Sequence, residues 1–254
     1  MAPAQPVGAP APRDGRIPAS CAHGCQNRDF SLYVHIPFCS VRCGYCDFNT
    51  YATEDFGDGI GLGTYADDAT AEIFFAARAL EASGVVKRPL HTVFFGGGTP
   101  TKLPAYDLVR ILRTAIDIFG IEDGAEVTTE ANPDSVTYED LQTLKDGGFT
   151  RVSFGMQSVV PEVLKVLDRT HTPENVPKVV AWARDIGLQV SIDLIYGSPS
   201  ETLEQWEQSV QAAISYQPDH ISAYSLIVED GTKLAAVDSD WCPILLWLSW
   251  YPSC

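Results

Sequence analysis

The sequence has few positive charges and no long hydrophobic run, and each shortage excludes a class of protein. Its 17 Lys and Arg stand against 33 Asp and Glu, which gives a formal net charge of −16 at pH 7. Such a chain repels nucleic-acid phosphates unless it carries a local basic patch, and the sequence has no Lys/Arg cluster. No stretch reaches the roughly 18 apolar residues of a membrane span, and residues 1–18 lack the apolar segment of a secretory signal. We therefore expect a cytoplasmic protein that binds no nucleic acid.

Seven cysteines in a chain without an export signal are expected to be free thiols or metal ligands rather than disulfides. Cys21 and Cys25 fall within residues 1–29, which are rich in Pro and Ala and show no periodicity. We predict that this segment is a disordered lead. The spacing of the two thiols would suit a metal, but no further ligand follows nearby, so a chance pair in a tail is the simpler interpretation.

Residues 30–234 alternate between strand-like and helical patterns, which is typical of parallel α/β folds. Short β-branched or aromatic runs predict six strands at 32–36, 92–95, 126–130, 151–154, 189–195 and 220–226. Spacing of three and four predicts helices at 65–82, 106–119, 138–145, 161–167, 174–186 and 203–216. Thr137 and Asp140 have the spacing of a capping box at the third helix. Six such units predict a partial (β/α)6 TIM-like barrel, with ligands at the carboxyl ends of the strands.

Three cysteines occur at CxxxCxxC spacing directly after the first predicted strand, at Cys39, Cys43 and Cys46. Thiolates hold iron–sulfur clusters, usually four per cubic cluster, so three would leave one iron open to another ligand. A zinc knuckle is the alternative, but a structural zinc site needs a fourth Cys or His. The pattern favours a four-iron–four-sulfur ([4Fe–4S]) cluster.

Several linked motifs make the chain resemble a known family. YVHIPFC and CGYCDF surround the cysteines, FFGGGTP ends the second strand, and RVSFGMQS, LDRTHT and IDLIYGSP follow. Together they resemble the radical S-adenosylmethionine (radical SAM) superfamily, in its oxygen-independent coproporphyrinogen III oxidase-like branch. The resemblance covers 32 to about 234 and implies a [4Fe–4S] cluster whose open iron binds S-adenosylmethionine.

The resemblance also implies which residues contact the S-adenosylmethionine. Gly97, Gly98 and Thr99 match contacts to its methionine part, and a run of glycines lets backbone approach a ligand closely. Glu130 and Asp193, two carboxylates in otherwise apolar strands, match contacts to the amino group and ribose. The remaining matched positions are Tyr33, Tyr45, Gln157, Arg169 and Ile227.

One departure from the oxidase pattern bears on function. The oxidases carry a further cysteine two residues after the third cluster ligand, and this chain has Phe48 there. The Cys-Asp-Phe form resembles a sister group of haem chaperones, which bind haem and pass it to acceptor proteins. The resemblance therefore implies that the protein carries haem. It also implies two kinds of partner: acceptor proteins for the haem and an electron donor. The alternative is a coproporphyrinogen III oxidase of porphyrin biosynthesis, which would bind a porphyrinogen.

Two other classes share part of this pattern. A tRNA-modifying radical enzyme would share the cysteine loop, but the acidic charge and the lack of a basic domain oppose it. A zinc-binding module would share only the cysteines and would not explain GGGTP, Glu130 and Asp193 at successive strand ends. Haem ligation would need a side chain such as His35, His171 or His220, and the sequence does not select one.

The last stretch, 235–254, differs from the rest. It holds three of the five Trp and two of the seven Cys beside Pro243 and Pro252, without helix or strand periodicity. The family pattern stops shortly before it, and the smaller C-terminal domain expected to cover the barrel mouth does not follow. We therefore expect a truncated or frame-shifted chain; an apolar tail that docks on the barrel is the alternative.

Overall fold

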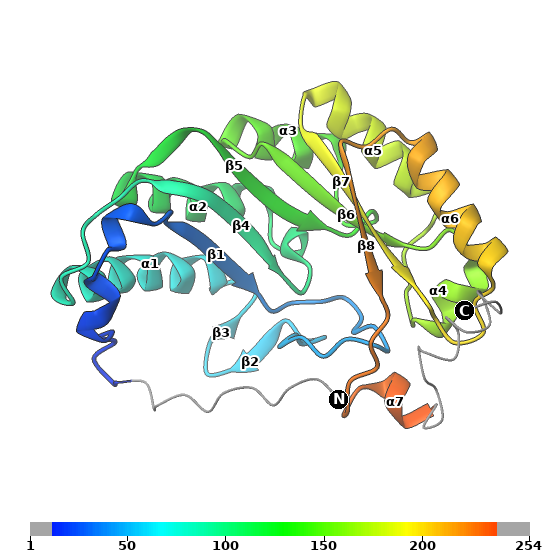
Figure 1. Ribbon diagram of the computed structural model, residues 1–254, viewed down its shortest axis with the longest axis horizontal. Coiled ribbons are helices and arrows are strands. Elements are labelled where there is room, and N and C mark those ends of the chain that lie inside the picture. Colours follow the sequence, from blue (N-terminus) through cyan, green and yellow to red (C-terminus); the bar gives the residue numbers. More distant parts are fainter. Residues whose placement is uncertain (1–11, 238–254) are drawn as a thin grey trace.

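The computed structural model describes residues 12–237. Six strands form one sheet in the chain order β1-β4-β5-β6-β7-β8, with every neighbouring pair parallel. Their bounds are β1 Ser31–Ile36, β4 Leu90–Gly97, β5 Ile121–Ala131, β6 Arg151–Gln157, β7 Gln189–Tyr196 and β8 His220–Ser225. The sheet curves, and the helices lie along its outer side (Figure 1). The predicted partial (β/α)6 barrel is thereby confirmed.

The helices fall where the hydrophobic periodicity placed them. Their bounds are α1 Tyr65–Ala82, α2 Ala105–Phe119, α3 Tyr138–Gly147, α4 Pro161–Val166, α5 Asn175–Ile186 and α6 Leu203–Ser215, with a short α7 at Lys233–Val237. The capping box at α3 is confirmed: the Thr137 hydroxyl accepts from the Asp140 amide at 3.1 Å, and the Asp140 carboxylate accepts from the Thr137 amide at 3.0 Å. No helix within residues 12–237 is both long and apolar enough to cross a lipid bilayer.

The sequence patterns did not indicate a small hairpin between β1 and α1. Its strands are β2 Asp55–Gly57 and β3 Ile60–Gly61, which pair antiparallel. The Phe56 ring packs on Phe38 and Tyr51, so aromatic contacts anchor the hairpin beside the cysteine loop. Runs of two and three residues are too short for a periodic signal to emerge.

Part of the lead predicted to be disordered has a defined structure. Residues 19–22 and 25–27 form two short 3-10 helices, and the Cys25 side chain is buried. The Arg28 guanidinium donates to the carbonyls of Cys21 and His23, and Arg88 donates to the Cys25 carbonyl. Long-range contacts thus order a segment whose composition alone gave no such signal. Residues 1–11 and 238–254, including most of the unusual tail, lie outside the described residues.

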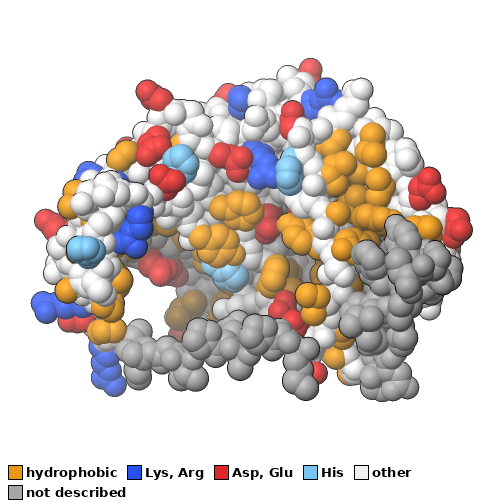
Figure 2. All heavy atoms as spheres, in the orientation of Figure 1, with side chains coloured by type: hydrophobic (Ala, Val, Ile, Leu, Met, Phe, Trp, Pro, Cys, Tyr) orange, Lys and Arg blue, Asp and Glu red, His pale blue; other side chains and the backbone are white. Residues whose placement is uncertain are grey.

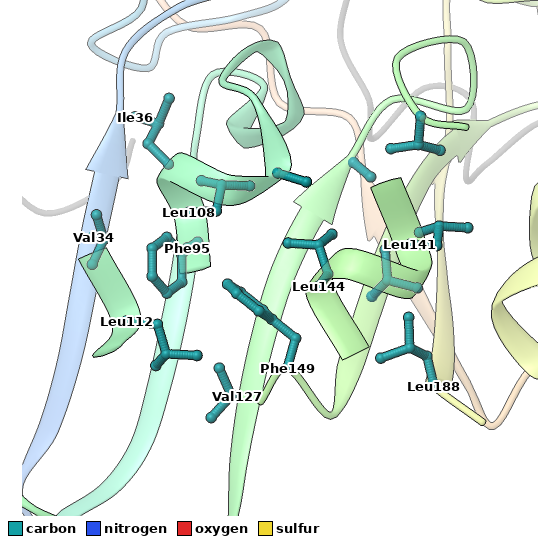
Figure 3. Packing of buried hydrophobic residues seen from close by; sticks show 14 of the residues in the cluster. Val34, Ile36, Phe95, Leu108, Leu112, Val127, Leu141, Leu144, Phe149 and Leu188 are labelled. Carbon is teal, nitrogen blue, oxygen red and sulfur yellow. The ribbon is translucent and has the colours of Figure 1, made fainter. Parts of the chain in front are cut away.

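The main hydrophobic core lies between the sheet and its outer helices. Phe95 and Phe149 pack at a centroid distance of 5.1 Å, and Leu108, Leu112 and Leu144 are fully buried around them (Figure 3). Each such side chain contributes about 1.5–3 kcal/mol by leaving water. At the far edge, β8 is largely exposed, and Figure 2 shows hydrophobic side chains gathered where Figure 1 places β7, β8 and α6.

We predict that Thr137→Ala lowers the free energy of unfolding by about 1 kcal/mol, because it removes the side chain that caps α3. Urea denaturation followed by circular dichroism measures this. Thr143→Ala is the matched control: Thr143 lies inside the same helix, is exposed, and bonds only the Glu139 carbonyl. It should leave stability unchanged or raise it slightly, because alanine favours helix interiors. Equal effects of both substitutions would contradict the capping role.

Candidate functional site

The carboxyl ends of the strands surround a cavity of about 500 Å³, a size typical of small-molecule sites. Parallel pairing brings the loops after β1, β4, β5 and β6 to the same rim as the end of β7. Most of the residues predicted for the site line this cavity: Cys39, Cys43, Tyr45, Cys46, Gly97, Gly98, Thr99, Glu130, Gln157, Arg169 and Asp193. Residues far apart in the sequence therefore line one cavity at the carboxyl ends of the strands, which is where the sequence predicted that ligands bind.

The cysteine loop is tied to neighbouring segments by backbone hydrogen bonds. The Cys39 amide donates to Tyr51 at 3.0 Å, and the Gly44 amide donates to Leu167 at 3.0 Å. The loop thus presents three half-buried thiols to the cavity. Burial raises the pKa of the Cys39 thiol, and hydrogen bonds from Thr99 and Thr50 oppose this.

The donor set suits an iron–sulfur cluster. Three thiols face one cavity, and among residues 12–237 no three His, Cys, Asp or Glu side chains are grouped as ligands of a single metal ion. A cluster held by thiolates needs such separate sulfur donors, whereas a structural zinc ion draws four ligands around one atom. A Cβ on Gly98 would lie 3.0 Å from the Cys39 sulfur and 2.6 Å from the Phe38 carbonyl oxygen. Only glycine lets this strand end approach the loop so closely.

The glycine segment at the end of β4 can pack closely against its neighbours because it has no side chains. Gly97 has a φ of +112°, and a Cβ there would meet the His35 ring at 2.6 Å. The Gly98 amide donates to the Ile36 carbonyl at 2.7 Å, which joins the segment to the end of β1. The Gly97 amide donates to a Glu130 carboxylate oxygen at 3.1 Å. The segment thus forms a backbone wall of the cavity and orients Glu130.

Two carboxylates face the same cavity, and both are costly to ionise there. Burial raises the pKa of Glu130 to about 7; Asp193 adds to this rise, whereas the Gly97 amide and Arg169 oppose it. Burial also raises the pKa of Asp193, although the Ser153 hydroxyl donates to its two oxygens at 3.0 and 3.2 Å. A cationic ligand would relieve this cost, so the pair is suited to a positively charged group such as an amine or a sulfonium.

Arg169 connects the cysteine loop to β6. Its Nη2 donates to the Gly155 carbonyl at 2.7 Å, and its Nη1 donates to the Cys43 sulfur at 3.5 Å. A Cβ on Gly155 would lie 2.6 Å from Nη2, so a side chain there would displace the guanidinium from its present position. Gln157, two residues further, has a φ of +63° and a buried Oε1 without a partner among residues 12–237. Strained backbone and unpaired polar atoms are typical of ligand sites.

Two predicted residues lie outside the cavity. Tyr33 is in the middle of the edge strand β1; its ring stacks on Phe94, its hydroxyl contacts His35 Nδ1 at 2.9 Å, and it is 55% exposed. Ile227 follows the opposite edge strand β8 and is 63% exposed. Neither is among the residues that line the cavity: Tyr33 lies in the middle of its strand and not at its carboxyl end, and Ile227 follows the outermost strand β8.

The structure adds cavity residues that the sequence analysis did not select. Ser153 and Gly155 share the inward face of β6 with Gln157, and the loops contribute Asn132, Asp134, Ser135 and His171. A signal for the first two was available: residues 153, 155 and 157 alternate along a buried strand, so all three point to one face. Of the loop residues, His171 lies in the LDRTHT motif and was named only as a candidate haem ligand, and the other three carried no comparable pattern.

We predict that Glu130→Gln stabilises the ligand-free chain at pH 8 by up to about 3 kcal/mol. The raised pKa means that the folded state holds a proton that the unfolded state releases, so stability falls as the pH rises from about 4.5 to about 7. Gln cannot ionise and should flatten this dependence in urea titrations at pH 5.5 and 8. Glu162→Gln, at an exposed position on α4, is the control. An unchanged pH profile in Glu130→Gln would refute the assignment.

Comparison with known proteins agrees with this geometry. Residues 33–213 match the sequence profile of the radical SAM superfamily. The chain is 45% identical over 207 residues to the heme chaperone HemW of Mycobacterium tuberculosis, covering 81% of this chain and 52% of that protein. It is 36% identical over 204 residues to the heme chaperone HemW of Bacillus subtilis, covering 80% and 52% respectively.

A solved structure shares the fold as well. The coproporphyrinogen III oxidase HemN of Escherichia coli, described as a radical SAM enzyme, superposes with a TM-score of 0.70 at 27% identity. That match covers 87% of this chain and 52% of HemN. The chain thus spans about half the length of the curated relatives it matches. Since the superfamily profile extends over most of the chain, including the cysteine loop and the carboxylates of the cavity, the chain belongs to the radical SAM superfamily.

Proposed function

We propose that this chain binds a [4Fe–4S] cluster through Cys39, Cys43 and Cys46 and binds S-adenosylmethionine in the adjoining cavity. The observation that carries the proposal is that the three thiols share one cavity with the glycine wall and the two carboxylates. Superfamily membership supports both cofactors. When bound, they supply one-electron chemistry that protein side chains cannot perform.

Different residues of the cavity contact different parts of the ligand. Glu130 and Asp193 provide carboxylates for the amino group and the ribose hydroxyls of S-adenosylmethionine. Gly97 and Gly98 leave room for the ligand beside the backbone, and Thr99 offers a hydroxyl there. Tyr45, whose pKa is raised by burial, stays neutral beside the cysteine loop. The chain thereby orients a cationic ligand beside the cluster loop.

We further propose that the whole protein acts as a haem chaperone, which binds haem and transfers it to acceptor proteins. Two relatives of this description share 45% and 36% of aligned residues with the chain. Phe48, which stands where the oxidase pattern has a cysteine, lines the cavity and is 59% exposed. An apolar ring there suits contact with a porphyrin face and provides no thiol. An electron donor and haem-acceptor proteins are the partners that follow.

Coproporphyrinogen III oxidase activity is the second candidate, because the fold matches that of HemN. It would decarboxylate coproporphyrinogen III to protoporphyrinogen IX. The two candidates share both cofactors and differ in what happens to the tetrapyrrole.

We predict that the reconstituted protein holds about four irons per chain and that Cys43→Ala loses them, because it removes one of three cluster ligands. Iron analysis and visible absorption after anaerobic reconstitution measure this. Cys21→Ala is the matched control, since Cys21 is exposed and lies outside the cavity. If Cys43→Ala retained as much iron as the Cys21 variant, the cluster assignment would be wrong.

We predict that Asp193→Ala weakens S-adenosylmethionine binding at least tenfold while the iron content stays the same. The substitution removes a carboxylate worth about 1.4 kcal/mol or more toward a cationic ligand. Isothermal titration with the reconstituted protein measures the affinity. Asp117→Ala, at an exposed position on α2, serves as control. Equal affinity in both variants would remove Asp193 from the site.

We predict stable haem uptake without turnover of coproporphyrinogen III. A full-length version of the reconstituted protein is offered haem in one experiment, followed by absorption spectroscopy. In another it is offered coproporphyrinogen III with S-adenosylmethionine and a reductant. A haem spectrum that survives gel filtration, with no protoporphyrinogen formed, supports the chaperone. Formation of protoporphyrinogen IX would instead establish the oxidase.

A further inference from the structure

His171 lies two residues after Arg169 and lines the same cavity, and the sequence offered it only as one of three candidate haem ligands. It is 5% exposed, and its Nδ1 faces the Nε of Arg169 at 3.3 Å. Together with the contacts to Gly155 and Cys43, this makes three fixed partners for one guanidinium. The direction in which Arg169 points therefore depends on His171.

The chemistry of this contact fixes the protonation of the ring. A guanidinium has only donors, so the ring nitrogen that faces it must be unprotonated, whichever way the ring is placed. The proton of a neutral ring then sits on the other nitrogen. Burial and the positive charge of Arg169 lower the pKa of His171 to about 4, and Asp134 opposes this only in part. His171 is accordingly neutral near pH 7, with one nitrogen available as an acceptor.

The second ring nitrogen indicates that packing alone does not explain this residue. It is buried and has no hydrogen-bond partner among residues 12–237. An unpaired buried N–H is destabilising, and an apolar side chain of similar shape would avoid that cost. The presence of a polar ring at this position despite that cost indicates that the other ring nitrogen, which accepts from Arg169, has a function.

Within residues 12–237, no carboxylate forms a hydrogen bond or ion pair with Arg169. Asp168 pairs with Lys233 at 2.8 Å. Asp134 accepts from the Thr172 amide and from the Asn175 side chain, each at 2.8 Å. Without His171, the Nε of Arg169 would lose its partner, and only the contacts to Gly155 and Cys43 would hold the guanidinium in place.

We infer that His171 is a positioning residue: it holds Arg169 against the cysteine loop, so that the hydrogen bond to Cys43 raises the reduction potential of the cluster. The inference rests on the proposed cluster function. A hydrogen bond to a cluster sulfur favours the reduced form, which carries more negative charge, and such bonds help to set the potentials of these clusters.

Two substitutions separate positioning from packing. His171→Leu keeps the bulk and removes the acceptor, whereas His171→Asn keeps an amide oxygen near the place of Nδ1. We expect His171→Leu to shift the cluster to a more negative reduction potential at unchanged iron content, and to weaken S-adenosylmethionine binding about tenfold. His171→Asn should recover most of both losses. His91→Leu, which replaces a half-exposed imidazole at the start of β4, should match the parent.

The potentials are measured by redox titration followed by electron paramagnetic resonance. Equal potentials in the parent and His171→Leu, or equal losses in the Leu and Asn variants, would overturn the inference. If the parent binds no iron, the cluster proposal itself fails, which iron analysis shows separately.

A second measurement on the iron-free parent needs no variant to fold. Nitrogen-15 spectra of its imidazoles should show His171 neutral between pH 5.5 and 8, with its proton on Nε2. A proton on the nitrogen that faces Arg169, or a charged ring at pH 6, would contradict the positioning role.

Discussion

Parallel pairing of all six strands is the constraint on which the site depends. Each strand runs in the same direction, so the residues that end β4, β5, β6 and β7 reach one rim of the sheet. The loop that follows β1 carries the cysteines to that rim as well. A single reversed strand would move its terminal residues to the opposite edge, about 20 Å away for a strand of six residues. The cavity therefore follows from strand direction before any side chain is considered.

The two carboxylates in this cavity have no cationic partner of their own within residues 12–237, and a positively charged ligand can provide one. Glu130 and Asp193 lie together in a partly desolvated space, and burial raises the pKa of each. Arg169 does not neutralise them by direct pairing, since its hydrogen bonds go to a carbonyl, a thiol and an imidazole. Such an arrangement lowers the stability of the empty protein and favours a cationic ligand, which is the usual trade between stability and function at binding sites.

Glycines determine how closely the parts of the site can approach. Gly98 sits against the Cys39 sulfur, Gly97 against the His35 ring, and Gly155 against the Arg169 guanidinium. At Gly97 and Gly98 a single methyl group would also crowd backbone carbonyl oxygens of residues 36 or 38, whereas at Gly155 it would displace the guanidinium. Precise placement of the cysteine loop and of Arg169 is thus a consequence of absent side chains as much as of present ones.

The sequence by itself determined the α/β alternation, the six main strands and helices, the capping box at α3 and the cysteine loop. These features are local: hydrophobic periodicity, cap spacing and CxxxCxxC lie within a few residues of one another. Linked motifs also identified the residues of the central strand ends, such as Glu130 and Asp193, because a carboxylate in a buried strand is conspicuous. All but two of the predicted contacts line the cavity.

Only the tertiary structure decided the remainder. The exclusion of Tyr33 and Ile227 from the cavity depends on their location at the two edges of an open sheet. The order within residues 19–27 depends in part on Arg88, which lies more than 60 residues away in the chain. Likewise, the contact between Arg169 and the Cys43 sulfur joins residues 126 positions apart and exists only in the folded chain. Such features arise from distances between segments, and neither residue type nor spacing along the chain encodes those distances directly.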